Sequence, residues 1–282
     1  MKNQTRRQFL QVISVGAVAS LSKTTNSLSQ VRSPGKETKK SLKLGLASYT
    51  LRKFSLERTL AETTRLDLKY ISLKDFHLPL KSTPAECQKA AEQVRKASIE
   101  LYGGGVIYMR NEAEVHQGFD YAKAAGMKII IGVPEHQLLP LVNKKVQEYD
   151  IKLAIHNHGP TDKVYPTPAS AYELIKDLDK RIGLCNDIGH TMRAGVDPAE
   201  SIEKFADRLL DVHIKDVTQA TKNGRTVEIG RGVIDIPKVI KTLLKIEYQG
   251  IVAFEYEKDA DDPFSGLAES VGYVRGVLAA FS

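Results

Sequence analysis

The sequence predicts a single (β/α)8 TIM barrel over residues 42–282. From residue 42 onward, short apolar runs alternate with longer amphipathic segments, and most of the apolar runs begin 24–30 residues apart. The runs are almost continuously apolar, as parallel strands covered on both faces must be. A doubly wound sheet is the alternative, but it would normally show a glycine-rich phosphate turn after its first strand, and this strand continues into SYTLRKF.

Eight apolar runs are the predicted strands. In chain order they are 42–47 (LKLGLA), 69–73 (KYISL), 99–103 (IELYG), 128–133 (KIIIGV), 152–156 (KLAIH), 182–187 (IGLCND), 209–214 (LLDVHI) and 250–255 (GIVAFE). About eight helices are expected between and after them. Eight strand–helix units in this length are typical of a barrel.

Helix starts are visible between these runs. TPAE at 83–86 supplies a capping hydroxyl, a proline in the first turn and a capping-box glutamate. DPAE at 197–200 repeats this start signal. Apolar residues then recur at helical spacing, as Cys87, Ala90, Val94 and Ala97 after the first start and as Ile202, Phe205 and Leu209 after the second.

The glycine-rich run YGGGVIYM (102–109) is expected after the third strand. Its glycines would let the backbone turn tightly or approach a ligand. It lacks the spacing of a phosphate-binding loop.

The N-terminal segment is expected to be an export signal. TRRQFLQ (5–11) resembles the twin-arginine consensus, and a short apolar segment follows it over 9–21. We therefore predict a signal segment over 1–30, a linker over 31–41 and export to the periplasm by the twin-arginine route. A disordered basic tail is the alternative.

The charge of the chain argues against a nucleic-acid partner. Its formal charge is +7, and residues 1–41 contain eight basic residues and one acidic residue, so 42–282 is balanced. A phosphate-binding surface would need a local basic excess. No run reaches the roughly 18 apolar residues of a spanning helix, so we expect no stable membrane insertion after signal removal. The sequence leaves the oligomeric state open.

Polar residues gather at the ends of the last four predicted strands. In TIM barrels the chemistry lies at these carboxyl ends, and side chains two apart on a strand share a face. Burying such groups without partners would cost several kcal/mol each, and one divalent cation would compensate the whole set. Mixed imidazole and carboxylate donors suit Mn, Fe, Co, Ni or Zn, with Mg also open; a buried network without metal is the alternative. The residues are His156, His158, Asp187, His190, His213, Lys215, Glu255 and Glu257.

Four motifs together resemble the xylose isomerase-like superfamily of sugar isomerases and epimerases. They are CNDIGHTMRAGVDP (185–198), LLDVHIKDV (209–217), IGRGVIDIPKVI (229–240) and GIVAFEYE (250–257). The resemblance implies that one divalent metal is held by His156, Asp187, His213 and Glu255. It also implies that His158 contacts these ligands or the substrate.

Position 156 departs from one branch of that superfamily. Its ketose 3-epimerases have Glu where this chain has His156, and they use two glutamates for proton transfer. An imidazole bound to a metal has no free lone pair with which to act as that base. The IHNHG form (155–159) resembles the branch with inosose dehydratase-like proteins and exported lyases acting on 3-keto-glycosides.

The resemblance implies removal of a proton next to the carbonyl of a sugar or keto-sugar. A metal would stabilise the developing enediolate. We assign catalytic roles to Lys215, His158 and Glu255, although Lys215 alternatively forms an ion pair with a carboxylate such as Glu257. The predicted substrate contacts are His77 and Lys74 in LKDFHLPL (73–80), together with His190 and Glu257.

Three further functions compete with isomerisation or epimerisation. The first is β-elimination by an exported keto-glycoside or polyol lyase or dehydratase of the same fold. The second is an endonuclease of the superfamily acting on abasic DNA, which would need more metal ligands in the first four strands. The third is a sugar-binding barrel without catalysis.

Overall fold

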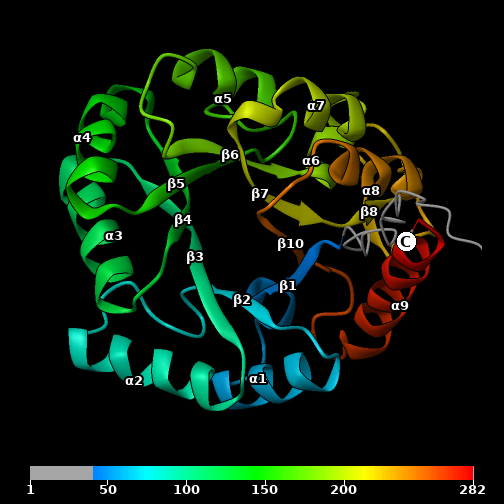
Figure 1. Ribbon diagram of the computed structural model, residues 1–282, viewed down its shortest axis with the longest axis horizontal. Helices are drawn as coiled ribbons and strands as arrows, with labels where there is room; N and C mark the ends of the chain where they lie inside the picture. The colour runs from blue at the N-terminus through cyan, green and yellow to red at the C-terminus, as the bar shows by residue number, and fades with distance from the viewer. Residues whose placement is uncertain (1–40, 282) are drawn as a thin grey trace, which may run out of the picture. The chain divides into compact units, whose positions relative to one another are not determined.

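The structure is a computed structural model that describes residues 41–281. The predicted signal segment and most of the predicted linker lie outside the described residues. Within them, eight parallel strands close into a barrel surrounded by helices (Figure 1). Neighbouring strands follow the order β1-β10-β7-β6-β5-β4-β3-β2, so the predicted TIM barrel is confirmed.

The barrel strands agree closely with the eight predicted runs. They are β1 (Lys43–Ala47), β2 (Tyr70–Leu73), β3 (Glu100–Met109), β4 (Ile129–Pro134), β5 (Lys152–His156), β6 (Ile182–Asp187), β7 (Leu209–Ile214) and β10 (Ile251–Phe254). All side chains of β4, β6 and β10 are buried, as expected for strands packed on both faces.

Helices alternate with these strands around the outside. They are α1 (Leu56–Arg65), α2 (Pro84–Lys96), α3 (Glu112–Ala124), α4 (Leu139–Tyr149), α5 (Pro168–Ile175), α6 (Ile188–Arg193), α7 (Pro198–Lys204), α8 (Ile236–Lys245) and α9 (Phe264–Ala280). Short 3-10 helices are η1 (Ser48–Leu51), η2 (His136–Leu138) and η3 (Ala206–Arg208). None of the helices within 41–281 is long and apolar enough to cross a bilayer.

Both predicted helix starts are present. The Thr83 hydroxyl accepts the Glu86 N–H while the Glu86 carboxylate accepts the Thr83 N–H, which completes a capping box. Asp197 caps α7 by accepting the N–H groups of Ala199 and Glu200.

The third strand differs from the prediction. Instead of ending at 103, β3 runs to Met109, and the glycine-rich run lies inside it. Here β3 approaches β4 so closely that a Cβ on Gly105 would lie 2.1 Å from the Ile131 carbonyl oxygen. Gly105 also has a φ of +145°, which side-chain-bearing residues rarely adopt. The glycines therefore serve contact between strands, and their predicted place after the third strand was wrong.

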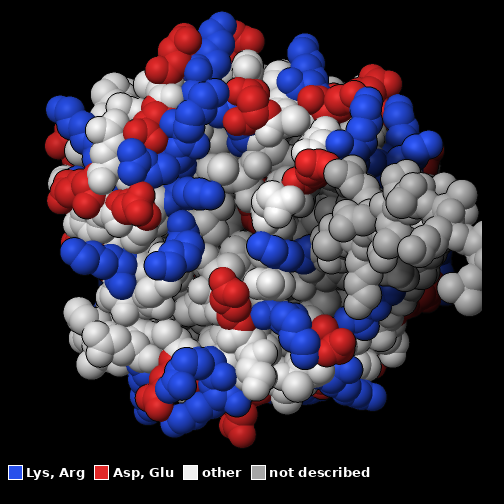
Figure 2. All heavy atoms as spheres, in the orientation of Figure 1, with Lys and Arg blue, Asp and Glu red and all other residues white. Residues whose placement is uncertain are grey.

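A short hairpin interrupts the regular pattern after β7. Strands β8 (Asp216–Val217) and β9 (Thr226–Val227) pair antiparallel between β7 and α8. Asp216 fixes the chain that follows, because its carboxylate accepts the N–H groups of Gly230, Gly232 and Ile234. Basic and acidic side chains are interspersed over the face seen in Figure 2, as the balanced charge of 42–282 predicts.

Candidate functional site

A cavity of about 320 Å³ lies at the carboxyl ends of the barrel strands. Five of the predicted site residues line one part of it: His156, His158, His190, Glu255 and Glu257. The remaining wall comes from the first half of the chain, with Tyr49, Lys74, Val106 and Tyr108. The structure thus brings most of the predicted residues to one place.

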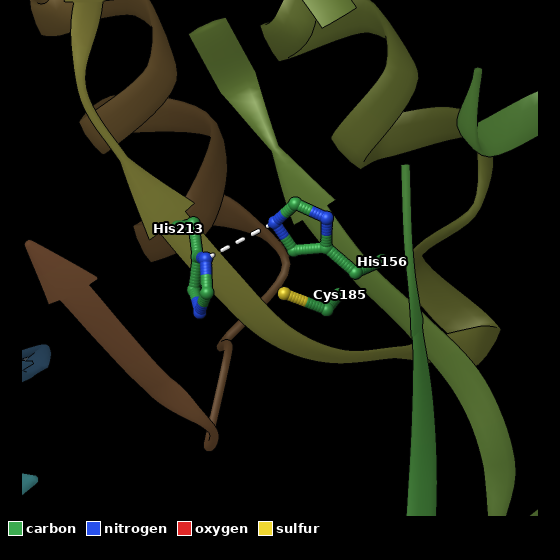
Figure 3. Close-up of side chains that lie close together, drawn as sticks. All are labelled: His156, Cys185 and His213. Carbon is green, nitrogen blue, oxygen red and sulfur yellow. Dashed lines mark hydrogen bonds between the residues drawn. The ribbon is translucent and has the colours of Figure 1, made fainter. Parts of the chain in front are cut away.

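Four predicted metal ligands converge beside this cavity, and two of them, His156 and Glu255, line it. Each offers one donor atom, and the four atoms lie within 4.8 Å of one another. His156 Nε2 lies 3.2 Å from His213 Nδ1 and 3.4 Å from Asp187 Oδ2. His213 Nδ1 in turn lies 3.2 Å from Glu255 Oε2. Figure 3 shows the two imidazoles facing each other, with the Cys185 thiol near the same space.

Strand register explains the convergence. His156 ends β5 and pairs with Cys185 on β6, while Asp187 ends β6 and pairs with His213 on β7. Asp187 also begins α6, where its Oδ1 accepts the His190 N–H at 2.8 Å. This cap holds the carboxylate so that Oδ2 points to the other ligands.

The four residues fit a divalent transition metal. Bonds of about 2.1 Å to a tetrahedral ion place neighbouring ligand atoms about 3.4 Å apart, close to the separations found here. Two imidazoles and two carboxylates are also the donor types that such ions prefer. His156, Asp187, His213 and Glu255 would therefore hold the metal.

Burial and neighbouring charges set the protonation of the ligand group. Burial lowers the pKa of His156 to about 3, so this imidazole is neutral and has a lone pair to give. Burial also opposes charge on His213, but the Glu255 carboxylate outweighs it and raises the pKa of His213 to about 9. Despite burial, the Lys215 ammonium holds the pKa of Asp187 and Glu255 well below the usual range.

Lys215 forms ion pairs with three carboxylates at once. Its Nζ lies 2.8 Å from Asp187 Oδ2 and 2.6 Å from Glu255 Oε2, and it also contacts Glu257. The side chain is 2% exposed. Burial disfavours the ammonium, yet the three carboxylates raise the pKa of Lys215 well above its usual value. The ion pair with Glu257 that the sequence left open is present, and Lys215 is a fixed positive charge.

The part of the chain that carries this site matches a known protein family. The family model described as "Xylose isomerase-like TIM barrel" matches residues 83–277, a range that contains all four proposed ligands. The chain belongs to the xylose isomerase-like TIM barrel family.

Several named relatives of this family member are inosose dehydratases. The chain is 28% identical over 131 residues to the rhizopine catabolism protein MocC of Rhizobium meliloti, a match covering 41% of this chain and 40% of that protein. It is 23% identical over 236 residues to an inosose dehydratase of Lacticaseibacillus casei, covering 76% and 79%. Several of the curated relatives are therefore matched over half their length or less.

Solved structures share the fold. A structure of the IOLI protein with a bound zinc atom has a TM-score of 0.71 at 18% identity, covering 86% of this chain and 99% of that one. An L-ribulose 3-epimerase has a TM-score of 0.69 at 17% identity, covering 85% and 95%.

In this family member, two histidines stand beside the ligands. His158 Nε2 is hydrogen-bonded to the Tyr108 hydroxyl at 3.1 Å, and its Nδ1 lies 3.2 Å from Asp162 Oδ2. His190 Nδ1 lies 3.1 Å from an Arg193 guanidinium nitrogen. Burial lowers the pKa of both histidines, so both are neutral near pH 7.

His77 is a predicted site residue that belongs neither to the cavity lining nor to the ligand group. Its Nδ1 is hydrogen-bonded to the Ser48 hydroxyl at 2.9 Å, and its Nε2 faces the Thr59 hydroxyl and the Leu51 carbonyl. These partners fix the segment after β2 to the start of the barrel. Lys74 does line the cavity, and its Nζ donates to the Val106 carbonyl.

Asp211 is a buried site residue that the sequence analysis missed. Its Oδ2 lies 3.5 Å from His213 Nε2, on the side of the imidazole away from the ligand group. Burial raises the pKa of Asp211 to about 6. The signal was present, because Asp211 and His213 are two apart on one strand and therefore share a face. Tyr49 and Tyr108 were also missed, although both lie in runs quoted above, SYTLRKF (48–54) and YGGGVIYM (102–109).

Proposed function

We propose that the chain is a metal-dependent enzyme that removes a proton next to the carbonyl of a sugar or keto-sugar, with isomerisation or epimerisation as the outcome. The observation that carries the proposal is the convergence of His156, Asp187, His213 and Glu255 at a cavity that His156 and Glu255 line. A metal ion, when bound there, would polarise the carbonyl and stabilise the enediolate that proton removal creates.

His158 is the best-placed base. Its lowered pKa keeps the imidazole neutral, and Asp162 lies against Nδ1, so Nε2 is oriented to the cavity wall beside Tyr108. Taking a proton at Nε2 would form an imidazolium that the Asp162 carboxylate stabilises.

Lys215 has the complementary role. Three carboxylates keep it charged, which makes it unsuitable as a base at neutral pH. It supplies a fixed positive charge beside the developing oxyanion and holds Asp187, Glu255 and Glu257 in place. Glu255 thus contributes to catalysis as a metal ligand. Lys74, His190 and Glu257 would contact substrate hydroxyls from the cavity wall.

β-Elimination by a lyase or dehydratase is the second candidate function. An epimerase needs a proton-transfer group on each face of the substrate, and an imidazole at 156 that binds metal cannot be one of them. Elimination needs a base on one face only, which the neutral His158 imidazole would supply; once protonated, that imidazole would return the proton to the leaving oxygen. The similarity to an inosose dehydratase over 76% of the chain agrees with this candidate. Export by the twin-arginine route remains a proposal.

Metal analysis of the full chain tests the proposal. We expect about one divalent metal per chain, lost in His156→Ala and kept in the matched control His116→Ala, whose side chain is exposed on α3. Keto-sugars incubated in D2O should then show metal-dependent deuterium exchange by NMR, and an enone absorbance would identify elimination. A folded protein that binds sugars but neither holds metal nor exchanges protons would instead be a sugar-binding barrel.

A further inference from the structure

A second cavity, of about 560 Å³, lies beside the first. Glu257 lines both cavities, so they meet at this residue. The second cavity is bounded by Arg193 at the end of α6, by Lys258 just after Glu257, and by the β8–β9 hairpin with Thr218, Arg225 and Thr226. A substrate that fills the first cavity can therefore extend past Glu257 into the second.

The cationic side chains of this second cavity are not equally neutralised. Lys258 lies 2.7 Å from the Glu228 carboxylate, which offsets its charge. Glu257 pairs with Lys215, which it shares with Asp187 and Glu255. Arg193 and Arg225, in contrast, form no ion pair with any carboxylate within residues 41–281: Arg193 contacts His190 Nδ1 and donates to the Lys222 carbonyl at 2.9 Å. Two guanidinium groups thus line one cavity without a carboxylate in ion-pair contact with either.

Arg193 is held in place by the hairpin. Gly224 sits over its aliphatic stem, where a Cβ would lie 3.2 Å from Arg193 Cγ. The Arg193 Nε is buried and has no hydrogen-bond partner among the described residues. An unsatisfied buried donor on a fixed guanidinium favours a ligand that accepts hydrogen bonds.

We propose that the second cavity binds an acidic substituent of the substrate, a carboxylate or a sulfate, through Arg193 and Arg225. Guanidinium groups match such oxyanions because they present several N–H donors in one plane and stay charged. The substrate would then be a two-part molecule, with a sugar ring beside His156 and an acidic group beyond Glu257. This inference rests on the proposed function for the sugar part.

Three glucosides that differ in one group test it. They are phenyl, 4-carboxyphenyl and 4-(sulfooxy)phenyl β-D-glucoside, which carry no charge, a carboxylate and a sulfate, and calorimetry with the full chain would measure their binding. We expect at least one acidic glucoside to bind about tenfold more tightly than the phenyl glucoside, with the advantage shrinking at high salt because screening weakens charge attraction. Whichever acidic glucoside binds more tightly identifies the substituent.

Matched arginine variants separate a specific site from general charge. Arg225→Gln should abolish the acidic advantage, whereas Arg231→Gln should keep it, because Arg231 is exposed, lies outside the cavity and pairs with Glu269. Equal binding of the three glucosides by the wild type, including no binding of any, would overturn the proposal. So would an advantage that survives Arg225→Gln.

The two proposals fail separately. Suppose that the protein holds metal and exchanges protons on neutral keto-sugars but does not prefer acidic glucosides. That result would overturn only the proposed role of the second cavity. Suppose instead that the protein prefers acidic glucosides, that Arg225→Gln removes this preference, and that the protein holds no metal. That result would overturn only the proposed metal-dependent reaction.

Discussion

Lys215 Nζ lies 2.8 Å from Asp187 Oδ2, an oxygen that also belongs to the proposed metal ligands. The same ammonium lies 2.6 Å from Glu255 Oε2. Two of the four ligand atoms are therefore shared with a buried positive charge. Such an arrangement weakens cation binding through like-charge repulsion while keeping the carboxylates ionised.

Replacing Lys215 separates its two effects. In Lys215→Met we expect turnover to fall by a factor of about 100 or more, because the charge beside the developing oxyanion is gone. Affinity for Zn²⁺ or Mn²⁺ should rise by about tenfold, since the repelling ammonium is removed. Metal titration and turnover of the same preparation measure both. Lys258→Met, which removes an ammonium that pairs with Glu228, should leave metal affinity unchanged; weaker metal binding in Lys215→Met would contradict the assignment.

Asp211 should matter through His213. In Asp211→Asn the carboxylate beside His213 Nε2 is lost, so the imidazole is less firmly oriented and a poorer donor at Nδ1. We expect metal affinity to fall by about 10- to 100-fold while circular dichroism stays that of the wild type. The control is Asp162→Asn, which lies against His158 and should reduce turnover without this loss of metal. Unchanged metal affinity in Asp211→Asn would show that the carboxylate does not orient the ligand.

His77 should affect stability but not substrate binding. His77→Ala removes the buried bridge to Ser48, Thr59 and the Leu51 carbonyl, so we expect the free energy of unfolding in urea to fall by about 1–3 kcal/mol. The KM of the remaining folded enzyme should not change. Lys74→Ala provides the contrast, because Lys74 lines the cavity and its loss should raise the KM. A raised KM in His77→Ala would restore the role that the sequence predicted.

Strand geometry predicts the group of polar strand-end residues to which the four proposed ligands belong, and the resemblance to the family selects those four from it. Each lies at or near the end of an apolar run, and parallel strands bring their carboxyl ends together whatever the loops do. His77 was misplaced because it lies in a loop, where no periodicity tells which way a side chain points. The β3 glycines were misplaced because the need for close contact with β4 comes from a strand distant in sequence. The second cavity could not be predicted, because it is bounded by the β8–β9 hairpin. The two strands of that hairpin have two residues each, too few to show an apolar pattern in the sequence.

Glu228 should make stability depend on acid pH. A hydrogen bond from the Lys258 ammonium lowers the pKa of Glu228 to about 2, and the Tyr256 hydroxyl adds a second one. Unfolding returns the pKa to about 4.5, so the folded state favours the carboxylate. The contribution of Glu228 to the free energy of unfolding is therefore complete above about pH 4.5 and is lost as the pH falls from there toward 2.

Removing the Glu228 carboxylate should remove its pH-dependent contribution to the free energy of unfolding. In Glu228→Gln we expect the free energy of unfolding at pH 7 to fall by about 1–2 kcal/mol, and the difference from the wild type to shrink as the pH approaches 2. Urea denaturation at pH 7, 5, 4 and 3 measures this. Glu269→Gln removes an exposed ion pair with Arg231 and should cost less than about 0.5 kcal/mol. A wild-type to Glu228→Gln difference that stays constant from pH 7 to 3 would mean that the Glu228–Lys258 pair does not set the pKa of this carboxyl group.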